Sequence, residues 1–265
     1  MSASAPRALF AGPGAARALV TGLTGVVEHT FAAGAYLRFG PDWVLLSERA
    51  APFGPLSLIA RGLPDGGPAV QTPVAVRGEQ LVLGDVEVSL ARVRERRAPA
   101  LAVSPGSGRD AVAALAAVAA LPPPPLALRA GIDALCAGRI AEGVCALAGL
   151  GDGLTPAGDD VLTGAAAVLS EHDGGHGARM STLAARRASA LGLAYMCCAE
   201  RGELPDPGAA LLVAIRRGSE RGVRAALEQL RGWGASSGSA LAWGICAGVA
   251  ASADAVICHA PAHPQ

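Results

Sequence analysis

The hydrophobic pattern of this chain changes once, between residues 95 and 109, and that change limits the folds open to it. Between residues 20 and 95, short runs rich in Val and Leu, such as "DWVLLSE" and "LSLIARG", are separated by Gly, Pro and Asp. Such runs are typical of β-strands joined by tight turns. From Arg109 onward, Ala-rich stretches such as "RDAVAALAAVAAL" replace them and favour helices.

We therefore predict an α+β fold with two domains. A small β-rich domain is expected at residues 1–103, and an Ala/Gly-rich all-helical domain at residues 104–265. The segment "RVRERRAPALAVSPGSG" at residues 92–108 is charged and then rich in proline and small residues, so we interpret it as a linker. Just over half of the residues are apolar, which is enough for a sizeable core.

Local patterns predict three further features. A hairpin is expected in "VRGEQLVL" with Gly78 at its turn, and a second turn at the Gly-Asp step of "VLGDVEV". The stretch "ARMSTLAARRASALGLAYMCCAERGEL", residues 178–204, predicts one long helix. Gly202 is its expected C-cap, and Pro205 its stop.

The charged residues exclude several function classes. Formal net charge is zero and no basic stripe is present, so a nucleic-acid interface is not expected. Every basic residue is arginine. Without lysine there is neither a Schiff-base mechanism nor a P-loop.

The cysteines and the apolar segments favour a cytoplasmic protein. None of the six cysteines forms a Cys-x-x-Cys pair, which favours buried free thiols over disulfides or a zinc site. The N-terminus has arginines and a Gly-Pro-Gly break in its apolar part, which argues against a signal peptide. The longest uncharged stretch, residues 232–253, is mostly Ala, Gly and Ser, so we expect a packed helix there and no membrane span.

The most unusual segment is "GLGDGLTPAGDDVLTGAAAVL", residues 149–169, in which a glycine-rich turn precedes an apolar helix. Thr155 is the expected N-cap and Pro156 the first helical residue. A helix N-terminus behind such a turn can bind an anion through its amides. A well-capped helix is the alternative, but capping does not explain the alternate glycines or Gly158 inside the first turn.

Asp159 and Asp160 follow in the same turn and are the candidate catalytic residues. The helix dipole favours them there, but they would repel a bare anion. In one interpretation they face away or bind arginines while the amides hold the anion. In the other, a carboxylate holds Mg²⁺ or a substrate N–H.

A second glycine-rich helix start occurs in "RGWGASSGSALAWGICAG". Ser236 and Ser237, flanked by Gly234 and Gly238, can cap the helix or bind an oxyanion. The two glycine-rich helix starts could converge on one ligand, which the sequence alone does not test.

At "GLGDGLTPAGDDVLTG" the sequence resembles the AllH family, whose shared stretch is Gly-Leu-Gly-x-Gly-Leu-Thr-Pro-(Ser/Ala)-Gly-Asp-Asp. "LGLAYMCCAERGELPDPGAALLVAI" and "GASSGSALAWGICAG" are similar to later family segments. Two departures stand out: Asp152 replaces a small residue or proline, and Ala188–Ser189 keeps one hydroxyl of an expected pair. The resemblance implies a cytoplasmic subunit of a carbamoyl-transfer complex in nitrogen catabolism, with FdrA-like and other co-encoded partners.

The family reaction relates oxalurate and phosphate to oxamate and carbamoyl phosphate, so the resemblance implies a small anionic substrate. The expected substrate-binding residues are those of the two helix starts: Gly151, Gly153, Leu154, Thr155, Gly158, Ser236, Ser237 and Gly238. Asp159 or Asp160 would orient the nitrogen or act as base. The Ser-Thr-Arg-Thr motif of ordinary transcarbamoylases is absent, so catalysis would use another solution or a partner subunit.

Two alternatives stay open. One is a stand-alone Mg²⁺-dependent amide or phosphate-ester hydrolase using both aspartates. The other is a non-catalytic ligand-binding or scaffold subunit. No cofactor is expected, apart from the Mg²⁺ that the first alternative requires.

Overall fold

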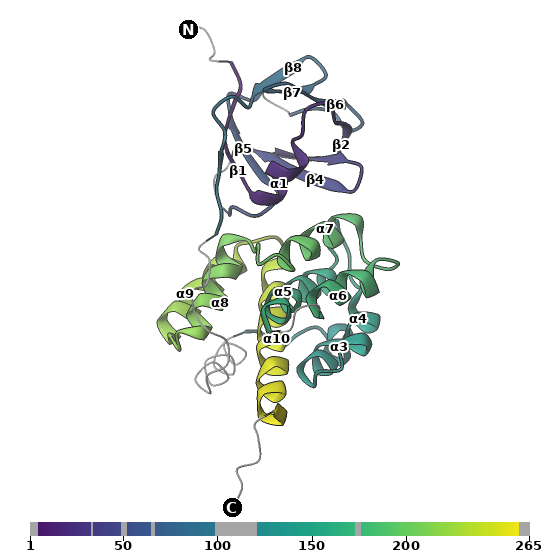
Figure 1. Cartoon of the computed structure of the whole chain (residues 1–265), viewed down its shortest axis with the longest axis vertical. Coiled ribbons are helices and arrows are strands. Elements are labelled where there is room, and N and C mark those ends of the chain that lie inside the picture. Colours follow the sequence, from purple (N-terminus) through teal and green to yellow (C-terminus); the bar gives the residue numbers. More distant parts are fainter. Residues whose placement is uncertain are drawn as a thin grey trace, which may run out of the picture. The chain divides into compact units, whose positions relative to one another are not determined.

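The computed structural model describes residues 5–32, 34–48, 52–64, 67–98, 121–172 and 176–259. The chain divides into two compact units, Met1–Ala98 and Pro99–Gln265. In the described residues every strand lies in the first unit, and every helix except α1 lies in the second (Figure 1). The predicted change from strands to helices is therefore confirmed.

The first unit is built from one sheet that closes on itself. Its strands are β1 (Arg7–Ala11), β2 (Thr24–Phe31), β3 (Gly34–Phe39), β4 (Asp42–Ser47), β5 (Ser57–Arg61), β6 (Pro73–Arg77), β7 (Gln80–Leu83), β8 (Val86–Ser89) and β9 (Arg94–Glu95). Their order is β5-β4-β3-β2-β6-β7-β8-β1-β9, and an antiparallel pairing of β1 with β5 closes the ring. Closure leaves few free strand edges.

Alternation along the strands fills the inside of this ring. Ala35, Leu37 and Phe39 of β3 are buried in one apolar core, while the residues between them are only partly buried. The predicted hairpin is confirmed, since β6 and β7 pair antiparallel around Gly78, whose φ is +56°. The Gly-Asp turn is confirmed as well, because β7 and β8 pair around it.

Three elements near the ends of this unit were not expected. β1 and the short helix α1 (Pro13–Ala18) precede the region predicted as strands, and β9 lies inside the predicted linker. β1 pairs with β5, β8 and β9, so its partners are 47 or more residues away in sequence and give no local signal. The rest of the predicted linker from residue 99, and the helix predicted in "RDAVAALAAVAAL", lie outside the described residues.

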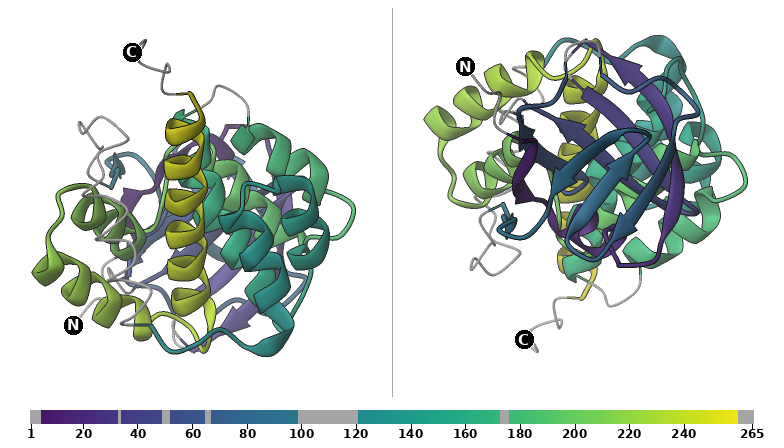
Figure 2. Two further views of the ribbon diagram at one scale, coloured as in Figure 1. Left: turned by 90° about the horizontal axis from the view of Figure 1, so that it is seen from below. Right: turned by 90° about the horizontal axis from the view of Figure 1, so that it is seen from above.

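The second unit is helical in its described residues. Its helices are α3 (Leu126–Cys136), α4 (Ile140–Leu147), α5 (Ala157–His172), α6 (His176–Ala184), α7 (Ala190–Ala199), α8 (Asp206–Arg216), α9 (Glu220–Arg231) and α10 (Ser237–His259). In Figure 2 α10 runs through the middle of the unit, with α8 and α9 on one side and α3 to α7 on the other.

Helices α5 and α10 form the centre of this unit. Residues 161–169 of α5 and 240–249 of α10 are all buried. The two helices touch at glycines, because a Cβ on Gly164 would collide with the carbonyl oxygen of Leu241, and one on Gly244 with that of Val161. This close crossing fixes the N-terminal ends of α5 and α10 relative to each other.

The single long helix predicted at residues 178–204 is wrong. The segment forms two helices, α6 and α7, because Ser189 adopts an extended backbone and its hydroxyl accepts a hydrogen bond from the Gly192 N–H as N-cap of α7. Helix α7 ends at Ala199, and Gly202 follows in the turn with a φ of +73°. Pro205 is the N-cap of the next helix, α8, rather than a stop.

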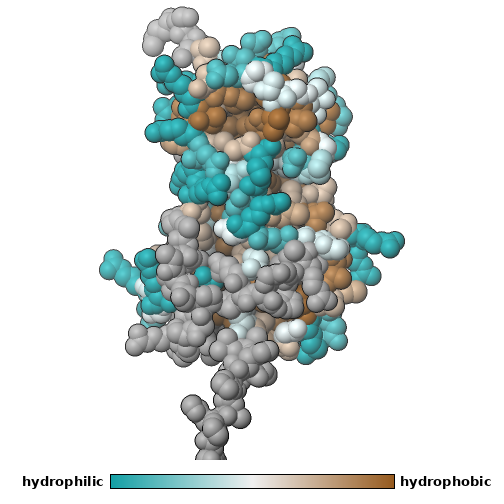
Figure 3. All heavy atoms as spheres, in the orientation of Figure 1, coloured by the Kyte–Doolittle hydropathy of each residue, from teal (hydrophilic) through white to brown (hydrophobic). Residues whose placement is uncertain are grey.

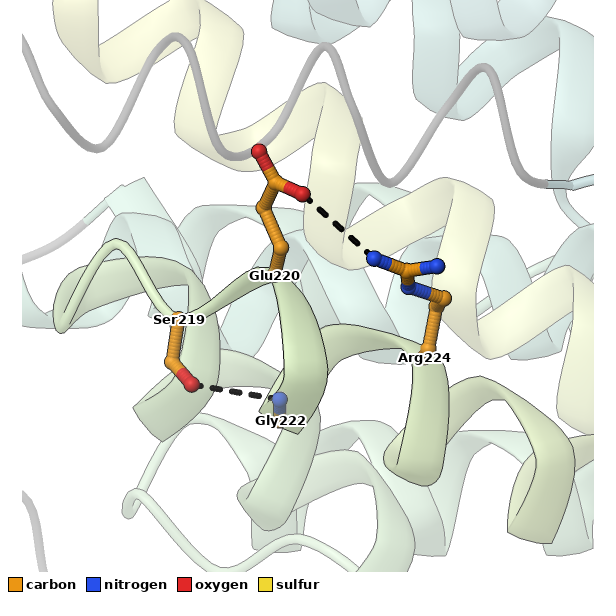
Figure 4. A network of polar contacts seen from close by, with 4 residues as sticks. All are labelled: Ser219, Glu220, Gly222 and Arg224. Atoms are coloured by element: carbon orange, nitrogen blue, oxygen red, sulfur yellow. Dashed lines mark hydrogen bonds and ion pairs between the residues drawn. The ribbon is translucent and has the colours of Figure 1, made fainter.

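Helix α9 shows the local signals of its sequence directly. The Ser219 hydroxyl accepts a hydrogen bond from the Gly222 N–H, and Glu220 pairs with Arg224 one turn along (Figure 4). A serine cap of this kind stabilises a helix by about 1 kcal/mol, whereas an exposed i,i+4 ion pair adds about 0.5 kcal/mol or less. The cap therefore contributes more to this helix start.

Two surface properties bear on the function classes. In the part of the chain that the structure describes, no helix is both long enough and apolar enough to cross a membrane. On the face drawn in Figure 3, hydrophobic side chains gather over the first unit. The exposed large apolar residues of that unit include Val20, Leu23, Phe31 and Val70.

Candidate functional site

The glycine-rich turn between α4 and α5 needs its glycines for its backbone shape. Gly149, Gly151 and Gly153 have φ values of +73°, +117° and +92°, a region that side chains disfavour. A Cβ at Gly149 would also collide with the Arg187 carbonyl oxygen, whereas nothing lies within 4 Å of one at Gly153. The turn is thus folded back against the segment before α7 and exposed at Gly153.

Helix α5 begins one residue later than predicted. The Asp160 N–H donates to the Pro156 carbonyl at 3.1 Å, so Pro156 is the N-cap and Thr155 precedes it. The predicted N-cap role of Thr155 is therefore wrong. The Thr155 hydroxyl oxygen lies instead 3.3 Å from the hydroxyl oxygen of Ser237. Gly158 has a packing role, because a Cβ there would collide with the Leu147 carbonyl oxygen.

Asp159 joins the turn, α5 and the start of α7. It is 0% exposed; its Oδ1 accepts the Gly149 N–H at 2.7 Å, and its Oδ2 accepts the Ser189 N–H at 2.8 Å. Gly192 leaves room for this carboxylate, since a Cβ there would lie 2.5 Å from Oδ2. Two charge-assisted hydrogen bonds hold both oxygens in place.

The second glycine-rich start brings Ser237 to the same point. The Ser236 carbonyl accepts the Ala240 N–H, so Ser236 takes the cap position of α10 and Ser237 begins the helix. A Cβ at Gly238 would collide with the Leu230 carbonyl oxygen, which makes Gly238 a packing residue. Ser236 is exposed, while Ser237 is half-buried.

Asp160 lies where the two helix starts meet. Its side chain is 7% exposed, and its Oδ2 has no hydrogen-bond partner in the described part of the chain. Burial raises the pKa of Asp160 to about 7; hydrogen bonds with Ser237 and Thr155 lower it, and the Asp159 carboxylate raises it. A buried polar atom without a partner costs free energy, so it indicates a ligand or a catalytic role.

The two helix starts therefore converge, as their spacing suggested. Thr155, Asp160 and Ser237 lie together, whereas Leu154 and Ser236 are exposed. The amides of Gly158, Asp159 and Asp160 already donate to the carbonyls of Leu150 and Pro156. The amides of residues 151–155 donate to no group among the described residues and stay available to an anion.

Metal binding through both aspartates does not fit this geometry well. No group of three or more His, Cys, Asp or Glu side chains that could hold a metal lies together in the described residues. Both Asp159 oxygens are already bonded to backbone amides. Among the described residues, the carboxyl oxygen without a partner at this point is Asp160 Oδ2.

Sequence reasoning missed the partners of Asp159. The N–H groups of Gly149 and Ser189 hold that carboxylate, and neither was expected to. The Ser-x-x-Gly spacing of Ser189 and Gly192 is a helix-start signal that would have divided the long predicted helix.

The AllH family matches residues 147–249. Its description is oxamate carbamoyltransferase subunit AllH. The AllH match covers Thr155, Asp159, Asp160 and Ser237, so the resemblance is confirmed for the segment that carries the candidate site. No curated protein and no solved structure matches the chain.

Proposed function

We propose that this chain is an AllH-like subunit of an oxamate carbamoyltransferase complex, in which Asp160 handles the proton of the reacting nitrogen. The family match supports membership of such a complex. The observation that carries the residue assignment is the buried Asp160 carboxyl group, whose Oδ2 has no hydrogen-bond partner among the described residues although the group has hydrogen bonds with Thr155 and Ser237.

The chemistry requires one proton transfer. In the synthetic direction, the oxamate nitrogen forms a bond to the carbamoyl carbon, and the bond from that carbon to the phosphate oxygen breaks. The nitrogen loses one proton, and the products are oxalurate and inorganic phosphate. Asp160 accepts that proton and passes it to the released phosphate. Its pKa of about 7 suits this task, because a base with a pKa near the working pH is most effective.

The remaining residues hold the reactants. The free amides of residues 151–155 bind an anionic group, and one of the Ser237 and Thr155 hydroxyls stabilises charge on the carbamoyl oxygen. Asp159 acts as a positioning residue, since both of its oxygens are bonded to backbone amides. Gly158 and Gly238 allow the two helix starts to approach their neighbours.

The proposal includes partners and a setting. FdrA-like and other co-encoded subunits complete the active complex, and the reaction belongs to nitrogen catabolism in the cytoplasm. A subunit of this kind binds substrate at its own helix starts and depends on its partners for turnover.

Reconstitution tests the proposal. Carbamoyl phosphate consumption with oxamate is measured for this chain alone, for the co-encoded neighbours without it, and for the full mixture. We expect activity in the full mixture only. Activity of the neighbours without this chain would contradict a required role for it. A strict divalent-metal requirement of the isolated chain would instead favour a stand-alone hydrolase.

A further inference from the structure

The candidate site has two chemically different halves. The free amides of residues 151–155 form a donor set in the turn, in which residues 151–154 are exposed and Thr155 is half-buried. Around Asp160, by contrast, the groups are a carboxyl oxygen and two hydroxyls. Donor amides suit an anion, whereas a carboxylate oxygen without a partner suits an N–H donor. The two halves therefore select opposite ends of a small ligand.

From this division we propose that Asp160, Thr155 and Ser237 form a recognition site for a primary amide, and that phosphate or carboxylate groups bind outside it. The proposal rests on the proposed function. It adds that the amide end of the substrate binds at this site. Oδ2 of Asp160 accepts the amide N–H, and the hydroxyl of Thr155 or Ser237 turns from its present partner to donate to the amide oxygen.

Charge favours an amide over an anion here. Asp159 is 0% exposed, and it is the charged group that acts on Asp160 among the described residues. No arginine is among those groups, and the chain has no lysine. A phosphate or carboxylate would therefore face two buried carboxyl groups without a compensating cation, which costs free energy in a poorly solvated site. A neutral amide meets no such repulsion.

Geometry favours the same conclusion. The α5–α10 crossing at Gly164 and Gly244 holds the Thr155 and Ser237 hydroxyl oxygens 3.3 Å apart, within hydrogen-bond distance of each other, so their positions are fixed before a ligand arrives. Asp159 fixes the backbone on the other side through Gly149 and Ser189. A preorganised site that forms a hydrogen bond with a ligand N–H group discriminates strongly against analogues that lack this group.

The test compares three ligands of nearly equal shape. Oxamate, oxalate and pyruvate share one carboxylate and differ at the other end, which is an amide, a carboxylate or a methyl ketone. Their dissociation constants are measured by calorimetry at pH 8, for the full chain and for the reconstituted complex. We expect oxamate to bind at least about tenfold more tightly than either analogue, which corresponds to about 1.4 kcal/mol.

Three variants test which residues produce the preference for oxamate over oxalate. Asp160→Asn should reduce the preference for oxamate over oxalate to about threefold or less, because an asparagine amide can turn either its oxygen or its nitrogen toward the ligand. Ser237→Ala should reduce it as well, and serves if Asp160→Asn does not fold. Asp133→Asn, an exposed aspartate on α3, should leave the preference unchanged.

The outcomes separate this inference from the proposed function. Equal binding of the three ligands by the chain and by the complex, or an unchanged preference in folded Asp160→Asn and Ser237→Ala, would overturn the inference even if the complex transfers carbamoyl groups. A selective, Asp160-dependent preference for oxamate without any carbamoyl transfer would support the inference and overturn the proposed function.

Discussion

Asp159 and Asp160 are adjacent in the sequence, yet the fold gives them different environments. Both are buried, but the two oxygens of Asp159 accept backbone N–H groups, whereas Oδ2 of Asp160 has no partner among the described residues. Neighbouring carboxyl groups with different surroundings commonly divide structural and chemical tasks. The predictions for the two residues therefore have opposite signs.

Asp159→Asn should destabilise the protein. An asparagine keeps one acceptor and turns an NH₂ toward the amide of Gly149 or Ser189, so one buried hydrogen bond is lost and two donors face each other. We expect the free energy of unfolding to fall by about 2–4 kcal/mol, measured by urea denaturation. Asp133→Asn is the matched control, and equal stability of the two variants would refute the positioning role.

Asp160→Asn should stabilise the protein above neutral pH. The folded-state pKa of Asp160 is about 7 against 3.8 for the free group, so folding favours its protonated form. The stability that this group provides is fully present below pH 3.8 and is lost as the pH rises to about 7. Asparagine removes this loss, and we expect a gain of about 2–4 kcal/mol at pH 8.

Urea denaturation at pH 8 and pH 5 measures this gain. The gain in the free energy of unfolding should be smaller at pH 5 than at pH 8, because Asp160 is already protonated in the folded protein at pH 5. A variant that is less stable than the unmodified protein at pH 8 would show that the carboxylate is held by favourable contacts. A stabilised but inactive variant is the pattern expected of a functional residue.

The sequence indicates these residues but not their roles. The acidic pair in a glycine-rich helix start is visible in the letters "GLTPAGDD". Which carboxylate is bonded depends on Ser189, which is 30 residues away from Asp159. No local pattern predicts that contact.

At the scale of helices, the crossing of α5 and α10 positions the site. Gly164 and Gly244 let the two backbones touch, and the helix starts meet a few turns away. The sequence predicts two glycine-rich helix starts, because caps and glycines are local signals. It predicts their meeting only as a hypothesis, since residues 155 and 237 are brought together by packing.

Gly244→Ala should disturb this crossing. A Cβ at Gly244 would collide with the Val161 carbonyl oxygen and lie 3.0 Å from the Ala165 nitrogen, so the helices must separate. We expect a loss of about 1–3 kcal/mol in the free energy of unfolding, together with a weaker preference for oxamate.

Gly232→Ala is the matched control for this glycine. Gly232 has a φ of −81°, and a Cβ there would approach nothing closer than 3.6 Å, so alanine should change stability by less than about 0.5 kcal/mol. Equal thermal and urea stability of the two alanine variants would mean that the crossing tolerates a methyl group.

The long helix predicted at residues 178–204 shows why some element boundaries escape sequence reasoning. Ala, Leu and Arg favour helix throughout this stretch, and no proline interrupts it. The break before α7 depends on the Ser189 cap and on the Asp159 carboxylate that binds the Ser189 N–H. Tertiary contacts overrode a continuous local propensity.

At the scale of the whole molecule, the division into strands and helices follows from hydrophobic period, but the topology does not. Alternating residues such as Leu37 and Phe39 identify strands. The closure of the sheet by β1 and β5 depends on pairs such as Arg7 with Arg61, which no turn connects. The hydrophobic period shows which face of a strand is buried. The closure of the sheet depends instead on pairing between strands that are far apart in the sequence.

We propose that the two units fold as separate domains, near the boundary expected from composition. The fragment 99–265 contains all the residues of the candidate site. It should unfold cooperatively in urea and keep the preference for oxamate over oxalate at pH 8. A fragment that is unfolded by circular dichroism would show that the helical unit requires the first unit.

The measurement that tests the central claim most directly is the rate of carbamoyl phosphate consumption with oxamate by the reconstituted complex at pH 8. The unmodified chain is compared with Asp160→Asn and with Asp133→Asn. The account predicts a fall of at least about tenfold for Asp160→Asn and unchanged rates for Asp133→Asn. A folded Asp160→Asn variant that supports the full rate would contradict a catalytic role for this carboxyl group.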